Sequence, residues 1–223
     1  MISPFFLLIV LLFMPCSTAE AKGGYNVWAK EKIRYLNSRI IRDPYNPQLR
    51  LLMANAYIND GRKFEAKKEL YRALELDSTF SEAYCNLGVV LHSQGYAKEA
   101  ETNYEIALSL DSTLVEARAG LGTLLCWSER QVEGLEHLEA VIRLDPDHRG
   151  ALYNMAVAYH QVEDFKKAIK YFEDLLQIQA DYPGAMVNLA RAYYSLGLLR
   201  LQAEQTDLAI AAFEQAVGYE VDN

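Results

Sequence analysis

A period of 34 residues runs through most of the chain and constrains its fold more than any other feature. Small residues stand at positions 54, 88, 122, 156 and 190, and each is followed three positions later by Tyr or Leu. Two further series keep the same step, namely Ala66, Ala100, Gly134 and Ala168, and Ala73, Ala107, Val141 and Leu175. A fixed period of this length is typical of repeat proteins, in which each unit packs mainly against its neighbours.

The spacing inside each period predicts a pair of helices. Small residues such as Gly88 and Ala156 would let a second helix approach the first to within about 8–10 Å. Large apolar residues at i, i+3 and i+7 would fill the space between them. The chain has only 6 prolines in 223 residues, so few helix breakers interrupt this pattern. Gly61, Gly95 and Gly197 are expected at the turn between the two helices, where a positive φ favours glycine.

The second period shows the pattern in full, with Tyr84, Leu87, Gly88 and Leu91 followed by Ala100, Tyr104 and Ala107. This resembles the tetratricopeptide repeat, whose signature is W-x2-L-G-x2-Y, then A-x3-F, then P. The resemblance implies an all-α fold, a right-handed α-solenoid of helix-turn-helix repeats that binds other proteins. It divides the chain into repeats at 47–80, 81–114, 115–148, 149–182 and 183–223. Residues 22–46 are then expected to form a capping helix that covers the first repeat through Trp28, Ile33, Leu36 and Ile40.

The fifth repeat departs from the others by about seven extra residues, because the alanine expected after Gly197 comes only at Ala209. Seven residues are about two helical turns, so the helix that starts near Pro183 should continue through residues 198–201. Thr206 and Asp207 are expected to cap the last helix. Relatives of this kind usually end in a further polar-faced helix, so an uncovered apolar face is expected around Phe213 and Tyr219.

The first 21 residues differ from the repeats. Residues 2–14 are almost wholly apolar, and would cover roughly 20 Å as a helix, short of the about 30 Å of a bilayer core. Small residues at Ser17, Ala19 and Ala21 then offer cleavage sites, so residues 1–21 are expected to be a signal peptide and the chain to be periplasmic or secreted. No cation precedes the apolar run and Lys22 follows it, so an uncleaved anchor at residues 2–14 is the alternative.

The resemblance also implies which side chains line the concave surface of the solenoid. Asn86, Asn154 and Asn188 share the sixth position of their repeats, and Asn55 stands at the ninth position of the first. Such a ladder resembles the superhelix of O-linked N-acetylglucosamine transferase, where asparagines hold the backbone of an extended peptide. An Asn amide offers both donors and acceptors and suits that task. The alternative is that these side chains solvate the groove or bond to neighbouring helices.

Other groove positions carry residues typical of binding anchors: Trp127, Tyr153, Arg191 and Tyr194. Some of these could instead pack against the neighbouring helix. The twelfth position carries His92, Cys126 and His160, but adjacent repeats lie about 8–10 Å apart, too far for ligands of one metal ion. These three are expected to line the groove, and Cys85 and Cys126 to stay unpaired.

Several classes of function are disfavoured by composition and motifs. The net charge is −8 with no basic cluster, which argues against nucleic acid as a partner. No nucleophile elbow, phosphate-binding loop or zinc-protease motif is present, so no enzyme, cofactor or small-molecule substrate is expected. The sequence predicts a scaffold that holds a partner polypeptide in its groove outside the cytoplasm. The alternative is an assembly factor of an envelope complex that self-associates or docks through its C-terminal face.

Overall fold

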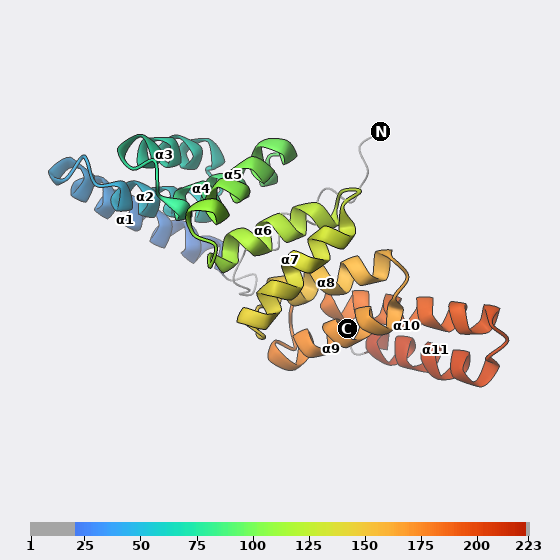
Figure 1. Cartoon of the computed structure of the whole chain (residues 1–223). Helices are drawn as coiled ribbons and strands as arrows, with labels where there is room; N and C mark the ends of the chain where they lie inside the picture. The colour runs from blue at the N-terminus through green and yellow to red at the C-terminus, as the bar shows by residue number, and fades with distance from the viewer. Residues whose placement is uncertain (1–20, 222–223) are drawn as a thin grey trace. The chain divides into compact units, whose positions relative to one another are not determined.

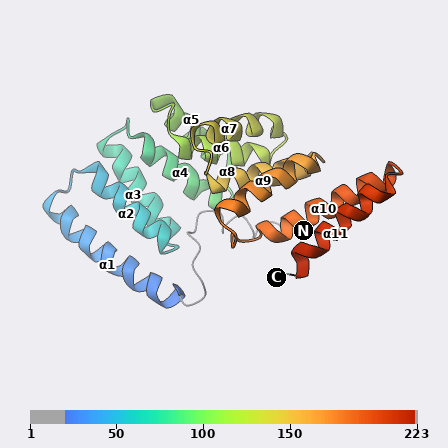
Figure 2. The ribbon, with the colours of Figure 1, turned by 90° about the horizontal axis from the view of Figure 1, so that it is seen from below.

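The computed structural model describes the backbone of residues 21–221 and the side chains of residues 28–219. Over this range the chain is all helical, with eleven α-helices and no strand, which confirms the predicted α-solenoid class (Figures 1 and 2). The helices are α1 (Ala21–Arg42), α2 (Pro47–Asn59), α3 (Lys63–Leu76), α4 (Ser81–Ser93), α5 (Ala97–Leu110), α6 (Val115–Cys126), α7 (Gln131–Leu144), α8 (Arg149–Gln161), α9 (Phe165–Ile178), α10 (Ala185–Gln202) and α11 (Thr206–Val221). The expected signal peptide or anchor at residues 1–21 lies almost wholly outside the described residues. Within them, every helix is too short or too polar to span a membrane.

The chain divides into two compact units, residues 1–124 and 125–223, which are described separately. In the first unit α2 pairs with α3 and α4 with α5, and α4 also packs on α3. In the second unit α8 pairs with α9 and α10 with α11, and α10 also packs on α9 and α8. Each unit therefore builds its core by placing the first helix of one hairpin against the hairpin before it.

Tyr104 shows how the small residues of the period act. Its ring is fully buried in the first unit, between Gly88 of α4 and Gly120 of α6. A Cβ atom at Gly88 would lie 2.7 Å from Cε1 of Tyr104, and one at Gly120 would lie 2.6 Å from the same atom. Only glycine leaves room for the ring, so the close helix approach predicted from Gly88 is confirmed.

Helix α1 packs on α2 through one face only. Ile33, Leu36 and Ile40 are buried against α2, where they meet Leu49 and Met53. Trp28, which was expected to share this contact, is 75% exposed. The expectation for Trp28 was therefore wrong, because it lies outside the buried stripe that Ile33, Leu36 and Ile40 form at a spacing of three and four residues.

The turns between paired helices follow the predicted geometry in some hairpins and not in others. Gly61 has φ of 75° and Gly95 has φ of 86°, as expected. Two glutamates, Glu163 at 62° and Glu204 at 60°, take the same conformation in the later hairpins. Gly197 does not form a turn, because it lies inside α10, and that prediction was wrong.

The seven-residue insertion explains the displaced turn. Helix α10 has 18 residues and continues through 198–201, as predicted. Seven residues make close to two turns, so Gly197 returns to the helix face of Ala190. There a Cβ would lie 2.5 Å from Cε1 of Phe213, the same role that Gly88 has towards Tyr104. Thr206 and Asp207 lie in the first turn of α11, after Gln205, whose carbonyl accepts from the amide of Ala209.

Tyrosine–glutamate hydrogen bonds join successive hairpins in the second unit. The hydroxyl of Tyr159 in α8 donates to Oε1 of Glu139 in α7 at 3.0 Å. The hydroxyl of Tyr193 in α10 donates to Oε1 of Glu173 in α9 at 2.6 Å. Both pairs are separated by twenty positions, so the bond repeats with the period. Burial and the adjacent carboxylate raise the pKa of both tyrosines above the usual value.

Candidate partner-binding surfaces

The asparagines of the first unit bond to each other. Nδ2 of Asn86 in α4 donates to Oδ1 of Asn55 in α2 at 2.8 Å, and both side chains are half-buried. The bond links two first helices of neighbouring hairpins. It matches the alternative in which the asparagines bond to neighbouring helices.

The aromatic and amide groups expected in the middle of the groove are buried. Tyr153 is only 4% exposed, and its ring packs edge-on against Phe172 at 5.8 Å and against Tyr182 at 5.4 Å. Asn154 is 7% exposed. Neither side chain presents a surface that a partner could contact, so the prediction that both line an open groove was wrong. The sequence pattern placed both residues on α8, but it could not show that Asn188 of α10 bonds to the Tyr153 hydroxyl.

Asn188, Arg191 and Tyr194 lie together on α10. Nδ2 of Asn188 donates to the hydroxyl of Tyr153 at 2.8 Å, and Oδ1 of Asn188 accepts from Nη1 of Arg191 at 3.1 Å. The Arg191 side chain is exposed and Tyr194 is 53% exposed. Of the predicted groove residues in the second unit, Arg191 and Tyr194 are thus presented to solvent, while both ends of the Asn188 amide are engaged within the fold.

The two histidines are half-buried and differ in their contacts. Nε2 of His160 lies 3.2 Å from Oγ of Ser195, and its ring packs on Phe165 at 5.2 Å. Burial lowers the pKa of both His92 and His160, so both favour the neutral form. Within the described ranges no group of three His, Cys, Asp or Glu side chains is arranged to hold a metal ion.

The cysteines are free thiols inside the fold. Cys85 and Cys126 are both buried and neither forms a disulfide, as predicted. Burial raises the pKa of each thiol to about 12. Cys126 is therefore a core residue, and the expectation that it lines the groove was wrong. Trp127, directly after it, is exposed.

Phe213 and Tyr219, the residues predicted for the C-terminal face, both pack against α10. Phe213 is half-buried and packs against Tyr194 at 5.5 Å, and Tyr219 stacks on Tyr193 at 5.9 Å. Both rings pack against tyrosines of α10, and Phe213 also lines the groove between α10 and α11 that is described below. Among the described side chains of α11, the large exposed apolar ones are Leu208, Ile210 and Val217.

A groove of about 400 Å³ lies between α10 and α11. It is lined by Val187, Ala190, Arg191, Tyr194, Phe213, Ala216 and Val217. Val187 holds the fifth position of its repeat, where Leu51, Cys85 and Tyr153 are all buried. Val187 is 47% exposed, whereas Tyr153 is covered by the hairpin that follows. The sequence shows that Val187 shares its repeat position with these three residues. It does not show that Val187 and Val217 are exposed.

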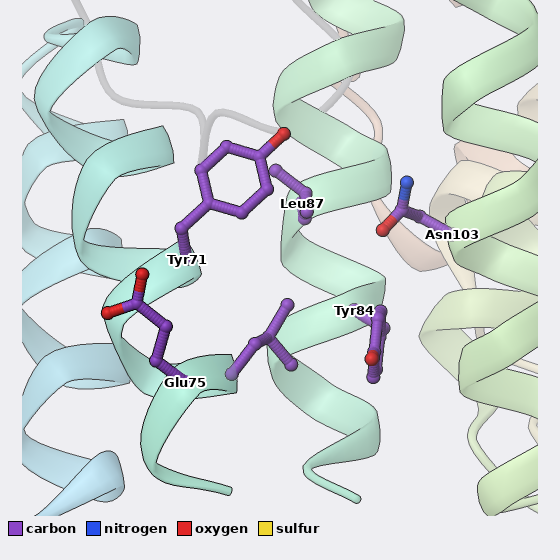
Figure 3. Close-up of a pocket in the computed structure, with 6 residues that line it drawn as sticks. Tyr71, Glu75, Tyr84, Leu87 and Asn103 are labelled. Carbon is purple, nitrogen blue, oxygen red and sulfur yellow. The ribbon is translucent and has the colours of Figure 1, made fainter. Parts of the chain in front are cut away.

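A second pocket, of about 380 Å³, lies in the first unit between α3 and α5, with α4 as its floor (Figure 3). It is lined by Tyr71, Leu74, Glu75, Tyr84, Leu87 and Asn103. None of these residues was predicted to bind a ligand. All lie at positions that the repeat pattern assigns to packing or to solvent.

Comparison with known families gives matches along much of the chain. Tetratricopeptide-repeat profiles match residues 47–80, 81–114 and 147–218. A TPR repeat-containing protein of Bacillus subtilis (strain 168), YpiA, is 40% identical over 87 residues. That match covers 37% of this chain and 19% of the relative, so the chain is similar to only a small part of it.

Solved structures share the fold at low sequence identity. The crystal structure of YrrB, described as a TPR protein with an unusual peptide-binding site, superposes with a TM-score of 0.66 at 21% identity. The superposition covers 84% of this chain and 93% of YrrB. A MamA protein gives a TM-score of 0.60 at 23% identity, covering 78% of this chain and 91% of MamA. PilF of Pseudomonas aeruginosa gives a TM-score of 0.63 at 17% identity, covering 92% of this chain and 98% of PilF.

Proposed function

Because this chain belongs to the tetratricopeptide-repeat family, whose members act as scaffolds for protein–protein interaction, we propose that it binds a helix of a partner polypeptide in the groove between α10 and α11. The observation that carries the proposal is the exposure of this groove. The equivalent groove between α8 and α9 is filled by α10, and that between α2 and α3 is approached by α4. Among the described residues, nothing fills the groove between α10 and α11.

The helix that fills the preceding groove indicates what the partner should look like. Buried residues of α10 recur as Ala185, Leu189, Ala192 and Leu196, a stripe of alternating small and large apolar side chains at i, i+4, i+7 and i+11. Such a stripe is typical of one face of an amphipathic helix. A partner helix with the same stripe would bury Val187 and Val217, each of which exposes about half of its side chain surface in the free chain.

Arg191 adds a polar requirement at the edge of the groove. Of its five N–H donors, the structure engages one, in the hydrogen bond to Asn188. A carboxylate on the partner helix could accept from the remaining donors in a bidentate pair. Tyr194 beside it offers an apolar ring with a polar hydroxyl, a combination enriched at protein interfaces. The partner is therefore proposed to be an amphipathic helix with an Asp or Glu next to its apolar stripe. The peptide-binding site named for YrrB supports peptide recognition on this fold.

A direct test uses a fluorescently labelled peptide with the sequence of residues 184–202, the helix that fills the preceding groove, with glutamate in place of its own Arg191. Anisotropy titrations with the full chain are expected to give saturable binding. Val187→Asp and Val217→Asp should weaken it at least tenfold, because each would bury an unpaired carboxylate. Ile210→Asp, an exposed apolar residue of α11 outside the groove, is the matched control and should leave binding unchanged. Equal binding by all three variants would overturn the proposal.

The second candidate is self-association through the same groove, which is favoured by the exposed apolar residues of the α10–α11 hairpin, including Leu199, Leu201 and Leu208. Sedimentation velocity of the full chain over a wide concentration range separates the two. Concentration-dependent dimers that Val217→Asp abolishes would identify a second copy as the occupant. A monomer at high concentration that still binds the labelled peptide would assign the groove to a partner polypeptide.

Export is proposed from the apolar residues 2–14 and the small residues that follow. The chain would then meet its partner outside the cytoplasm, as a protein that begins after residue 21. Amino-terminal sequencing of protein recovered from the native host tests this. A terminus at Glu20 or Lys22 supports cleavage, whereas an intact Met1 in the membrane fraction would support the anchor.

A further inference from the structure

Helix α1 has an exposed face that the proposed function does not use. Its buried residues Ile33, Leu36 and Ile40 pack on α2, and α1 lies along the outer side of α2 within the first unit (Figure 2). The opposite side of the helix carries two aromatic rings and three cations, all of them exposed: Trp28, Lys32, Tyr35, Arg39 and Arg42. Their spacing of four and three residues aligns them in one stripe about 21 Å long, the outer face of α1.

The outer face is basic although the chain as a whole is acidic. Residues 28–42 hold five of the 22 Lys and Arg residues and one of the 30 Asp and Glu residues, Glu31. The cations form no run in the sequence because other residues separate them, but the helix brings three of them onto one side. Among residues 28–219 none of these three forms an ion pair. Their charge therefore remains available to an anionic surface.

Tyr35 and Arg39 are held together in the middle of the outer face. Nη1 of Arg39 donates to the Tyr35 hydroxyl at 2.9 Å, and Cζ of Arg39 lies 5.9 Å from the centre of the Tyr35 ring. A guanidinium has five N–H donors, and this bond engages one of those of Arg39. The other donors can pair with the oxygens of a phosphate group, which guanidinium groups bind in a bidentate manner.

The two aromatic rings favour a lipid surface. Trp28 is 75% exposed and Tyr35 is 57% exposed, and they lie two helical turns apart. Trp and Tyr are enriched where membranes meet water, because each has an apolar ring and a polar tip. Basic helix faces that carry Trp are typical of helices that lie on membrane surfaces.

The sequence before α1 also favours a lipid surface over an acidic protein. The apolar residues 2–14 are proposed to be a signal peptide or an anchor, and either would bring this part of the chain to a membrane. Trp28 follows Met14 by fourteen residues, which can span at most about 50 Å. The outer face can therefore reach the membrane that residues 2–14 contact.

We propose that the outer face of α1 binds the surface of a bilayer that contains anionic lipids. Its three cations pair with lipid phosphates, and its two rings lie at the level of the headgroups. The apolar side of α1 stays packed on α2, so binding requires no unfolding of the first unit. The face is separate from the α10–α11 groove, and its test does not depend on the outcome of the peptide titration.

The test follows the fluorescence of Trp28 in the full chain with Trp127→Phe, which leaves Trp28 as the one tryptophan. Vesicles of phosphatidylcholine and phosphatidylglycerol are compared with vesicles of phosphatidylcholine alone. The emission is expected to shift to shorter wavelength with the anionic vesicles, and the apparent affinity should fall as salt rises. An equal shift with phosphatidylcholine alone would overturn the proposal, because the apolar residues 2–14 would then account for it.

Charge variants in the same background locate the contact. Lys32→Gln and Arg39→Gln should each weaken binding to the anionic vesicles about fivefold, and together about 25-fold. The matched control combines Lys68→Gln and Lys98→Gln, which remove the same charge from exposed positions of α3 and α5, and it should change binding less than twofold. All four side chains are exposed, so these variants are expected to fold. Equal weakening by both pairs would contradict the proposal, since the response would then follow net charge alone.

Polyglutamate in place of vesicles tests the alternative that the outer face binds an acidic protein. The expected result is little change in Trp28 emission at a charge concentration at which the anionic vesicles saturate it. A shift with polyglutamate and none with the anionic vesicles would assign the face to an acidic polypeptide and overturn the lipid proposal.

Discussion

Asn188 donates a 2.8 Å hydrogen bond through Nδ2 to the hydroxyl of Tyr153, and that hydroxyl belongs to one of the most buried tyrosines of the chain. The bond runs from α10 back to α8 and so holds two successive hairpins together. Asn188, which the repeat pattern predicts to contact a ligand, therefore helps to hold the fold together. Burial also raises the pKa of Tyr153 above its ordinary value.

Asn188→Ala is expected to lower the free energy of unfolding by about 1–2 kcal/mol, because it leaves the buried Tyr153 hydroxyl without its donor. Tyr153→Phe should cost less than this, since it removes the hydroxyl itself. Urea unfolding of the two single variants and the double variant measures the coupling. A double variant as unstable as the sum of the singles would show that the bond contributes nothing.

Gly197→Ala is expected to destabilise the α10–α11 hairpin by about 1–3 kcal/mol, because its Cβ would lie within 2.5 Å of the Phe213 ring and force the two helices apart. Gly218→Ala is the matched control on α11. A Cβ there meets nothing within 4 Å, so the helix propensity of alanine should stabilise the chain by about 0.5–1 kcal/mol. Thermal unfolding of the two variants should therefore shift in opposite directions. Shifts of the same sign would contradict the packing role of Gly197.

Glu204→Gly is expected to raise the free energy of unfolding by about 0.5–1 kcal/mol. Glu204 has φ of 60° in the turn before α11, a conformation that costs a side-chain-bearing residue about 1 kcal/mol and costs glycine little. Glu214→Gly, in the exposed middle of α11, should instead destabilise by about 1 kcal/mol. Chemical unfolding of the two variants distinguishes these outcomes. A destabilised Glu204→Gly variant would mean that a contact of the Glu204 side chain stabilises the fold by more than the backbone strain costs.

The sequence predicts the fold well because the same packing recurs with every repeat. Gly88 lets the second helix of its hairpin approach closely, as predicted, and Tyr104 of that helix packs on it; α10 also extends through the inserted residues. The candidate site is predicted less well, because the 34-residue period does not show which side chains a neighbouring helix covers. Tyr153 was assigned to an open groove, but α10 covers it and Asn188 bonds to it across 35 positions. The displaced turn was missed for a related reason. An insertion of two full turns preserves the helix face, so Gly197 changes from a turn residue to a packing residue.

Cys85 gives a prediction for the pH dependence of stability. Burial, and then the carboxylates of Glu116 and Glu82, raise the pKa of this thiol to about 12. In the unfolded chain the thiol titrates near its ordinary value of about 8.5–9. The folded chain therefore keeps a proton that the unfolded chain releases. The resulting stabilisation is fully present below pH 8.5 and is lost as the pH rises towards 12.

The measurement compares a chain in which Cys16 and Cys126 are alanine with one in which Cys85 is also alanine. Between pH 9 and pH 10 the chain that keeps Cys85 should lose about 1 kcal/mol of unfolding free energy relative to the chain without it. Below pH 8 the difference between the two should stay constant. Parallel profiles up to pH 10 would show that the Cys85 thiol titrates alike in both states. The Cys85 thiol would then have to be accessible to solvent in the folded chain. A thiol reagent would label it there at the rate of a free thiol.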